Sequence, residues 1–311
     1  MPETGRLELV DEPVPDMAED EVLVRVTHCG VCASELDIFT GKARHVKFPR
    51  YPGHEVSGVV ERRGRAVKNV RRDDPVAVWV TARGFADYVV AKGEHCFSAR
   101  SVPLELALGE PIACAVNAVE LAAPALGDDV VIIGAGFMGL LIEQLVALRG
   151  PNELFVADTR PDALEWAGRF GATRVVNVLE ESLPDLVKKV TKKRGADVAF
   201  EVTGQQKPLA MLGRVTRMSG TVAIAGYHQG PPRRIPLGAW NWLAFRIANA
   251  HFRDVPTIMR GMRGGMQLLV SGKLKLDGLV THTFPLEDVE KAFRTALDKP
   301  EGFVKGTVQV S

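Results

Sequence analysis

Residues 129–139 contain the pattern that most restricts how this chain can fold. Asp129-Val-Val-Ile-Ile133 reads as a buried strand, and Gly134-Ala-Gly136-Phe137-Met138-Gly139 follows it at once and opens a helical pattern. A glycine-rich turn between a buried strand and a helix is typical of a parallel sheet that binds a dinucleotide. The first glycine permits the tight turn, the second lets the backbone approach a pyrophosphate, and the third lets the helix pack on the strand.

Apolar strands and amphipathic helices alternate along the chain after this turn. We expect strands at residues 153–158, 174–178, 197–202 and 221–225, and helices at residues 136–149, 161–170, 183–193 and 208–218. This alternation predicts an α/β fold in which helices cover both faces of a doubly wound parallel sheet. We place this dinucleotide-binding domain at residues 116–250.

The rest of the chain has a different texture. Short β-rich runs at residues 21–26, 56–60, 75–80 and 86–91 predict a barrel-like β domain. After residue 250 we expect two helices and two strands, at 255–271, 279–284, 286–297 and 306–310. Residues 1–115 and 251–311 are therefore assigned together to the second domain.

The composition excludes several classes of partner. The 311 residues have a formal net charge of +1 and no basic block, so we expect neither a nucleic acid nor an anionic membrane as partner. No apolar run reaches the ~20 residues of a membrane helix, and the first residues have no signal-peptide layout. Four cysteines in a chain of this size do not suggest a disulfide scaffold, and we expect a cytoplasmic protein.

Asp158 ends the strand after the glycine-rich turn. A carboxylate there can accept both hydroxyls of the NAD ribose and would repel a 2′-phosphate. Arg160, two residues further on, would favour NADP instead. We expect NAD, because the acid lies at the strand end itself.

Cys32 and His54 are candidate metal ligands at the ends of predicted strands. Cys32 lies in Gly-Val-Cys-Ala-Ser, a predicted loop, and His54 lies in Tyr-Pro-Gly-His-Glu. A thiolate and an imidazole suit zinc, which in catalytic sites has three protein ligands and one open position. Spacing alone leaves Cys114, Glu110 and Glu55 as alternatives for the third ligand.

In their order along the chain, these motifs resemble those of the zinc-dependent medium-chain dehydrogenase/reductase family, of the alcohol and sorbitol dehydrogenase type. The matching stretches are residues 30–35 (Gly-Val-Cys-Ala-Ser-Glu), 53–55 (Gly-His-Glu), 110–112 (Glu-Pro-Ile) and the glycine-rich turn. The resemblance covers nearly the whole chain. It implies a GroES-like β-barrel catalytic domain joined to a Rossmann domain.

The resemblance also implies roles for individual residues. Cys32, His54 and Glu110 would bind zinc, directly or, for Glu110, through a water. Glu55 would lie behind the ligands or exchange with one of them, and Cys114 would pack beside the nicotinamide. Arg253, near the predicted return to the first domain, would reach the cofactor.

The chain departs from the family pattern at several positions. No group of four closely spaced cysteines follows residue 80, so we expect one zinc per chain and no structural-zinc lobe. Glu35 replaces the usual aspartate, and Asp37 occupies the place of a relay histidine. The route by which the proton leaves the site is therefore not assigned. His228, at the carboxyl end of a predicted strand, is a candidate substrate contact.

The expected activity is NAD-dependent interconversion of a secondary alcohol and its ketone. Zinc would act as a Lewis acid, Ser34 would relay the proton, and the nicotinamide would accept the hydride. The expected substrate is a polyol, cyclitol or sugar, and the family suggests a homodimer or homotetramer. Two alternatives are a zinc-free NADPH-dependent quinone or enoyl reductase and a non-catalytic zinc- or nucleotide-binding relative.

Overall fold

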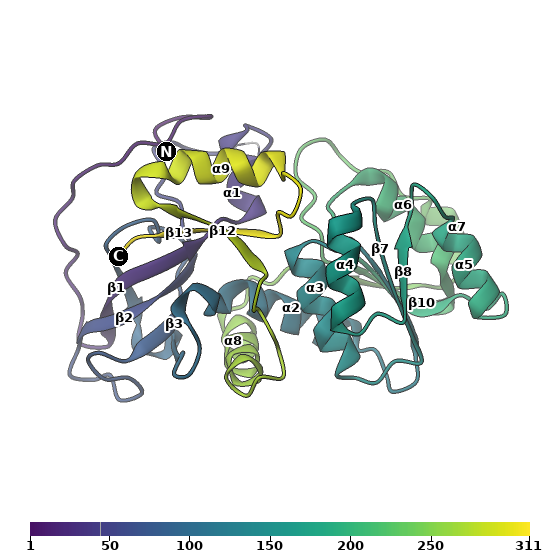
Figure 1. Ribbon diagram of the computed structural model, residues 1–311, viewed down its shortest axis with the longest axis horizontal. Coiled ribbons are helices and arrows are strands. Elements are labelled where there is room, and N and C mark those ends of the chain that lie inside the picture. The colour runs from purple at the N-terminus through teal and green to yellow at the C-terminus, as the bar shows by residue number, and fades with distance from the viewer. Residues whose placement is uncertain (44) are drawn as a thin grey trace. The chain divides into compact units, whose positions relative to one another are not determined.

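The computed structural model describes residues 1–43 and 45–311, which form two compact units. One unit comprises Met1–Ala113 and Ile258–Ser311, and the other comprises Cys114–Thr257. Each unit has its own sheet and its own core (Figure 1).

A six-stranded parallel sheet organises the unit of residues 114–257. Its strand order is β11-β10-β9-β6-β7-β8. The strands are β6 (Asp129–Ile133), β7 (Glu153–Asp158), β8 (Arg174–Asn177), β9 (Ala196–Glu201), β10 (Thr216–Ile224) and β11 (Arg246–Asn249). The helices between them are α3 (Phe137–Ala147), α4 (Pro161–Phe170), α5 (Leu183–Val190), α6 (Gln206–Val215) and α7 (Leu237–Trp242).

The central strands of this sheet are buried on both faces. Every residue of β6 and of β9 is buried, which explains why their central residues, 130–133 and 198–200, read as continuous apolar runs rather than as an alternation. One core cluster of the unit joins Val131, Phe155, Leu212 and Trp240. Parallel pairing places the carboxyl ends of the strands at one edge, which is the edge where open α/β sheets bind ligands.

A mainly antiparallel seven-stranded sheet organises the other unit. Its path is β12-β13-β1-β2-β3-β5, and β4 pairs with β1 off this path. The strands are β1 (Glu21–Gly30), β2 (Glu55–Arg63), β3 (Pro75–Trp79), β4 (Tyr88–Lys92), β5 (Cys96–Ser98), β12 (Val280–Pro285) and β13 (Lys305–Gln309). The helices are α1 (Ala33–Phe39), α8 (Val255–Val270) and α9 (Val289–Asp298), and α2 (Gly109–Ala122) begins in this unit.

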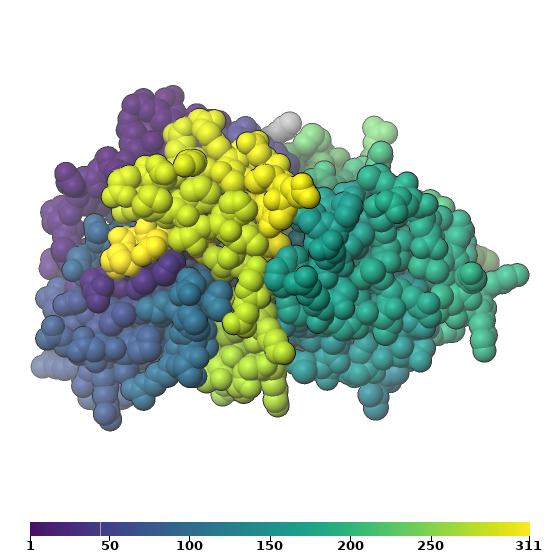
Figure 2. All heavy atoms as spheres, in the orientation of Figure 1, coloured from purple at the N-terminus to yellow at the C-terminus, as the bar shows by residue number. Residues whose placement is uncertain are grey.

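Strand β1 is the centre of this second sheet. It pairs antiparallel with β2, β4 and β13, so the first and last strands of the chain are neighbours. Figure 2 shows the C-terminal residues in yellow packed against N-terminal residues in purple. In the register of β1 and β2, Gly30 is opposite Glu55, and Gly30 is also opposite Thr307 of β13. The ends of three strands therefore meet where Cys32 and His54 leave the sheet.

The expected fold class is confirmed, and some local predictions are corrected. The residues around Cys32, expected as a loop, lead into helix α1, and neither α7 nor β11 was expected. Residues 216–218, expected to be helical, begin strand β10, because Thr216 pairs with Ala196 of β9. Among the described residues, no helix is long and apolar enough to cross a membrane.

Candidate functional site

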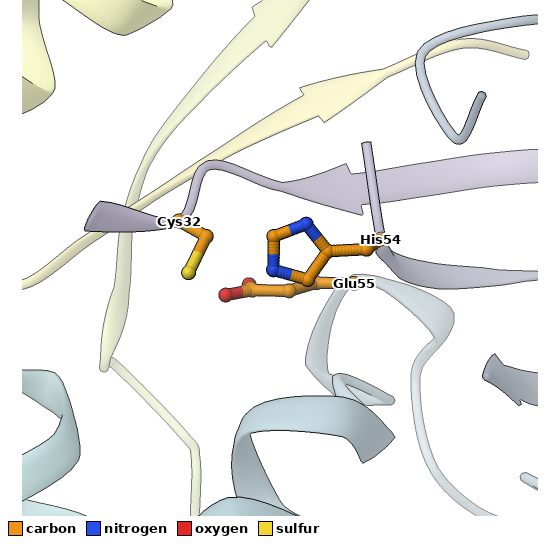
Figure 3. Close-up of side chains that lie close together, drawn as sticks. All are labelled: Cys32, His54 and Glu55. Carbon is orange, nitrogen blue, oxygen red and sulfur yellow. The ribbon is translucent and has the colours of Figure 1, made fainter. Parts of the chain in front are cut away.

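Cys32, His54 and Glu55 bring their ligand atoms together at one end of the antiparallel sheet. Cys32 immediately precedes α1, and His54 and Glu55 stand at the start of β2. The sulfur, one imidazole nitrogen and one carboxylate oxygen all lie within 4.8 Å of one another, and the three side chains point toward a common centre (Figure 3). Strand pairing produces this convergence, because the end of β1 lies beside the start of the antiparallel strand β2.

Glu35 fixes the orientation of His54. Its Oε1 accepts a hydrogen bond of 2.5 Å from the N–H of Gly53 and lies 3.0 Å from Nδ1 of His54. Because an ionised carboxylate only accepts hydrogen bonds, Nδ1 carries a proton and Nε2 is the nitrogen available to a metal.

The protonation of His54 reflects opposing influences. Burial lowers the pKa of His54, but the charges of Glu35 and Cys32 and hydrogen bonds to both outweigh it, so this pKa lies well above its usual value. A metal ion would have to displace the proton from Nε2, because ligands bind metals in their deprotonated form.

Ser34 contacts the sulfur of Cys32. Its hydroxyl donates a hydrogen bond of 3.3 Å to Sγ. Three residues further along α1, the carboxylate of Asp37 forms a 2.9 Å ion pair with Lys42. The helix that the sequence analysis missed thus presents both the relay candidate and the residue that occupies the relay histidine's place.

Glu55, one of the metal-ligand candidates, also forms a buried ion pair with Lys305. Nζ of Lys305 is 2.5 Å from Oε2 of Glu55 and donates a hydrogen bond of 2.9 Å to the carbonyl of Val31. Burial lowers the pKa of Lys305, but the charge of Glu55, followed by those of Cys32 and Glu110, raises it above its usual value. The ammonium is therefore a fixed positive charge beside the site.

Glu110 and Cys114, two of the three candidates for the third ligand, lie outside the group of converging atoms. Glu110 is half-buried in the first turn of α2 and is close enough for its charge to act on Lys305. Among residues 1–43 and 45–311, the group with ligand-like spacing contains Glu55 instead. Cys114 belongs to the unit with the parallel sheet.

The donor set fits a zinc ion. A thiolate, an imidazole and a carboxylate from three residues are the number and kinds of ligand that catalytic zinc takes, with one coordination position left open. Glu35 supplies the carboxylate behind the histidine that such sites usually have.

The glycine-rich turn has the packing that its three glycines predict. Gly134 adopts φ = +114°, and a Cβ on Gly139 would lie only 1.8 Å from the carbonyl oxygen of Gly134. A Cβ on Gly136, in contrast, would meet no atom within 4 Å. The turn therefore packs tightly inside and leaves open space where α3 begins, next to Phe137 and Met138, which is what a bound pyrophosphate requires.

Asp158 lies at the carboxyl end of β7, directly beside this turn. Its Oδ2 accepts a hydrogen bond of 2.7 Å from the N–H of Ala135, and its Oδ1 accepts bonds from the N–H groups of Thr159 and Arg160. The guanidinium of Arg160 lies 3.6 Å from Asp162. The carboxylate is thus held at the edge of the sheet where a ribose would lie.

His228 forms part of a network at the carboxyl ends of β9 and β10. Its Nε2 lies 2.7 Å from Oε2 of the buried Glu201, and its Nδ1 accepts a hydrogen bond of 3.1 Å from Arg233. These bonds engage both ring nitrogens of the substrate-contact candidate. Arg253 lies in an exposed loop, where its guanidinium bonds the carbonyl of Phe252.

Sequence reasoning missed Lys305, Glu201 and the contact of Glu35 with His54. Glu35 was visible only as a departure from the family's aspartate. Lys305 had no signal, because a lysine near the end of a chain is ordinarily exposed, and it is the position of β13 between β1 and β12 that buries this one.

Comparisons with known proteins show which family the chain resembles. Residues 18–101 match the family described as alcohol dehydrogenase GroES-like domain, and residues 138–255 match the family described as zinc-binding dehydrogenase. The chain is 28% identical to sorbitol dehydrogenase of Bacillus subtilis over 96% of this chain and 92% of that protein. It is also 28% identical to L-threonine 3-dehydrogenase of Pyrococcus abyssi, over 92% and 90% of the two chains.

A solved structure gives the same fold. The galactitol-1-phosphate dehydrogenase of Escherichia coli superposes with a TM-score of 0.86 at 23% identity, covering 99% of this chain and 98% of that one. The chain belongs to the zinc-dependent medium-chain dehydrogenase/reductase family. Its relatives are dehydrogenases of small-molecule alcohols, which supports an oxidoreductase activity.

Proposed function

We propose that this protein is a zinc-dependent, NAD-linked dehydrogenase that interconverts a secondary alcohol of a polyhydroxylated compound and the corresponding ketone. The convergence of Cys32, His54 and Glu55 within 4.8 Å of one another carries the proposal. The open turn at Gly136 and the carboxylate of Asp158 support the nucleotide half of it.

The proposed zinc ligands are Cys32, His54 and Glu55. Their spacing favours Glu55 over Glu110, the ligand that the family resemblance suggested, and Glu110 then lies beside the site as a second carboxylate. When bound, the zinc polarises the oxygen of the substrate and stabilises negative charge on it.

Residues around the ligands orient them and move the proton. Glu35 holds the imidazole of His54 so that Nε2 faces the other two ligand atoms. Ser34 lies beside the sulfur of Cys32, and we assign to its hydroxyl the first acceptance of the substrate proton. Hydride transfer itself is the chemistry of the nicotinamide, for which the protein supplies position.

NAD is the proposed cofactor because Asp158 presents a carboxylate to the ribose site. An Asp158→Ser variant removes the charge that disfavours a 2′-phosphate, so we expect its ratio of kcat/KM for NADP to kcat/KM for NAD to rise at least about tenfold, or ~1.4 kcal/mol. Exposed Glu165→Ser, on the following helix α4, is the matched control. An unchanged ratio in the Asp158 variant would remove this residue from cofactor selection.

The proposed substrates are polyols, cyclitols or sugars. The names of two relatives, sorbitol dehydrogenase and galactitol-1-phosphate dehydrogenase, support this class, and L-threonine is the competing substrate suggested by the third.

The decisive experiment measures NADH formation by zinc-loaded protein with polyols, cyclitols, sugars, simple alcohols and L-threonine. We expect turnover of a polyhydroxylated compound, and we expect Cys32→Ser and His54→Ala to abolish it while NAD binding persists. Turnover of L-threonine alone would replace the substrate class. NADPH-dependent reduction of a quinone or enone by metal-free protein would replace the proposal with the zinc-free reductase.

We also propose that the chain forms a homodimer or homotetramer through the edge of its parallel sheet. Strand β11 ends the sheet in the described part of the chain, and Ile247 on β11 is 50% exposed and Trp242 on α7 is 80% exposed. Exposed apolar residues at an unpaired sheet edge favour pairing with another strand. Light scattering after gel filtration should give a mass of two or four chains, and a monomeric mass would refute the proposal.

A further inference from the structure

Lys305 is a buried cation in contact with a proposed metal ligand, and the proposed function assigns it no role. The residue begins β13 and is 6% exposed. Its Nζ contacts Oε2 of Glu55 at 2.5 Å and the carbonyl of Val31 at 2.9 Å. The contacts join the last strand of the chain to the segment that leads into Cys32.

Glu55 is confined on the side that faces Lys305. The residue is 1% exposed, and a Cβ on Gly30 would lie 2.0 Å from its Oε2. Oε2 therefore occupies a slot that exists because residue 30 has no side chain, with the ammonium at the end of that slot. The same carboxylate belongs to the group formed with Cys32 and His54.

A carboxylate shared in this way is a weaker metal ligand than a free one. The ammonium draws electron density from Glu55, and its charge also acts on Cys32 and Glu110. In a site of low dielectric constant, these charges interact strongly. In known sites, mutation of a group that supports a ligand from behind lowers metal affinity by about 10–100-fold, and we take the same magnitude for a group that opposes a ligand.

We infer that Lys305 is a positioning residue that restrains Glu55 and thereby weakens its binding to the metal. The inference rests on the proposed zinc site. Removing the ammonium leaves Glu55 as a buried carboxylate without its cation, which destabilises the metal-free protein and makes a metal ion the best available partner.

The test uses Co²⁺ as the probe, bound to the full-length protein. In Lys305→Met, which retains most of the side-chain volume, we expect Co²⁺ to bind about tenfold more tightly than in the unmodified protein, within the range for groups behind the ligands. We also expect a lower Tm without metal, a larger rise in Tm on Co²⁺ binding, and altered visible absorption bands, because the coordination by Glu55 changes.

A double-mutant cycle separates this effect from direct repulsion between the ammonium and the metal. If Lys305 acts through Glu55, Lys305→Met should change Co²⁺ affinity little when Glu55→Gln is already present. Equal tightening in both backgrounds would overturn the inference in favour of direct repulsion. Unchanged or weaker Co²⁺ binding in Lys305→Met would also overturn it.

Lys92→Met is the matched control, because Lys92 forms an ion pair with Asp20 at 2.8 Å on the surface of the same unit. This variant should bind Co²⁺ as the unmodified protein does. If the unmodified protein shows no sulfur-to-cobalt absorption, the proposed metal site fails and takes the inference with it. Normal cobalt binding with no effect of Lys305→Met would defeat the inference alone.

Discussion

At the scale of single residues, the candidate site depends on side chains that act on one another rather than on ligands alone. Glu35 determines which nitrogen His54 presents, and Ser34 bonds the sulfur of Cys32. The hydroxyl of Ser34 lies where it can serve two purposes, since it can stabilise a thiolate or accept a proton from the substrate. Kinetics can distinguish these purposes.

A Ser34→Ala variant should lower kcat by about 10²–10⁴-fold if the hydroxyl carries the substrate proton. The affinity for Co²⁺ should change much less, because the three proposed ligands remain. Stopped-flow measurement of NADH formation against pH reports the proton step, and Ser34→Thr, which keeps a hydroxyl, is the control that should retain most of the rate. A full rate in Ser34→Ala would place the relay elsewhere.

At the scale of elements, the proposed nucleotide site is the junction of β6 and α3. The helix can approach the strand only because Gly139 has no side chain, whereas Gly136 borders open space. The two glycines therefore serve different ends, internal packing and ligand access. Substitution by alanine at each position separates these roles.

Gly139→Ala should destabilise the fold by about 1–3 kcal/mol, because its methyl group would overlap the carbonyl of Gly134. Gly136→Ala should leave the Tm nearly unchanged but weaken NAD binding, because its methyl group enters the open space beside the turn. Thermal unfolding and NADH fluorescence titration give the two quantities. Gly168→Ala, on α4 with nothing within 4 Å of a Cβ, is the control and should keep NAD affinity. Equal Tm values for the three variants would contradict this division.

At the scale of the whole molecule, buried ionisable groups make stability depend on pH. Glu143, on α3, is fully buried, and its Oε1 accepts a hydrogen bond of 3.0 Å from the N–H of Ala172. Burial raises the pKa of Glu143 to about 8, and the hydrogen bond from Ala172 opposes this only in part. Near the start of β9, the guanidinium of Arg194 donates a hydrogen bond of 2.7 Å to the carboxylate of Asp197. Burial raises the pKa of Asp197, but hydrogen bonds from Arg194 and Arg217 outweigh it and hold the value at about 2.

Glu143 should make the protein less stable as the pH rises from about 4.5 to 8. In this window the unfolded chain releases the proton of Glu143 while the folded chain retains it, which costs up to about 1.4 kcal/mol per pH unit. Glu143→Gln should remove that slope and raise the Tm at pH 8, whereas exposed Glu165→Gln on α4 should not. Thermal unfolding across pH 5–8 is the measurement, and identical slopes in the two variants would show that Glu143 is already ionised.

Local sequence determined those elements whose characteristic pattern of apolar residues and glycines lies within a short stretch of the chain. The buried strands β6, β7 and β9, the glycine-rich turn and Asp158 at its strand end could all be read from the chain, because parallel strands and phosphate turns impose a strict order of apolar residues and glycines. Cys32 and His54 were recognised from their motifs for the same reason. The edge strand β11 was missed, since a short strand exposed on one side has little apolar signal.

Tertiary structure decided which side chains meet. The pairing of β1 with β2 and β13 brings Glu55 beside Cys32 and buries Lys305 behind it, although the three residues are far apart in the chain. Local sequence records the tendency of each segment to form a strand or helix, but the partner of a strand depends on contacts over the whole fold. The sequence therefore determined the kind of site, and strand pairing brought Glu55 to the other two candidate ligands and placed Lys305 against its carboxylate.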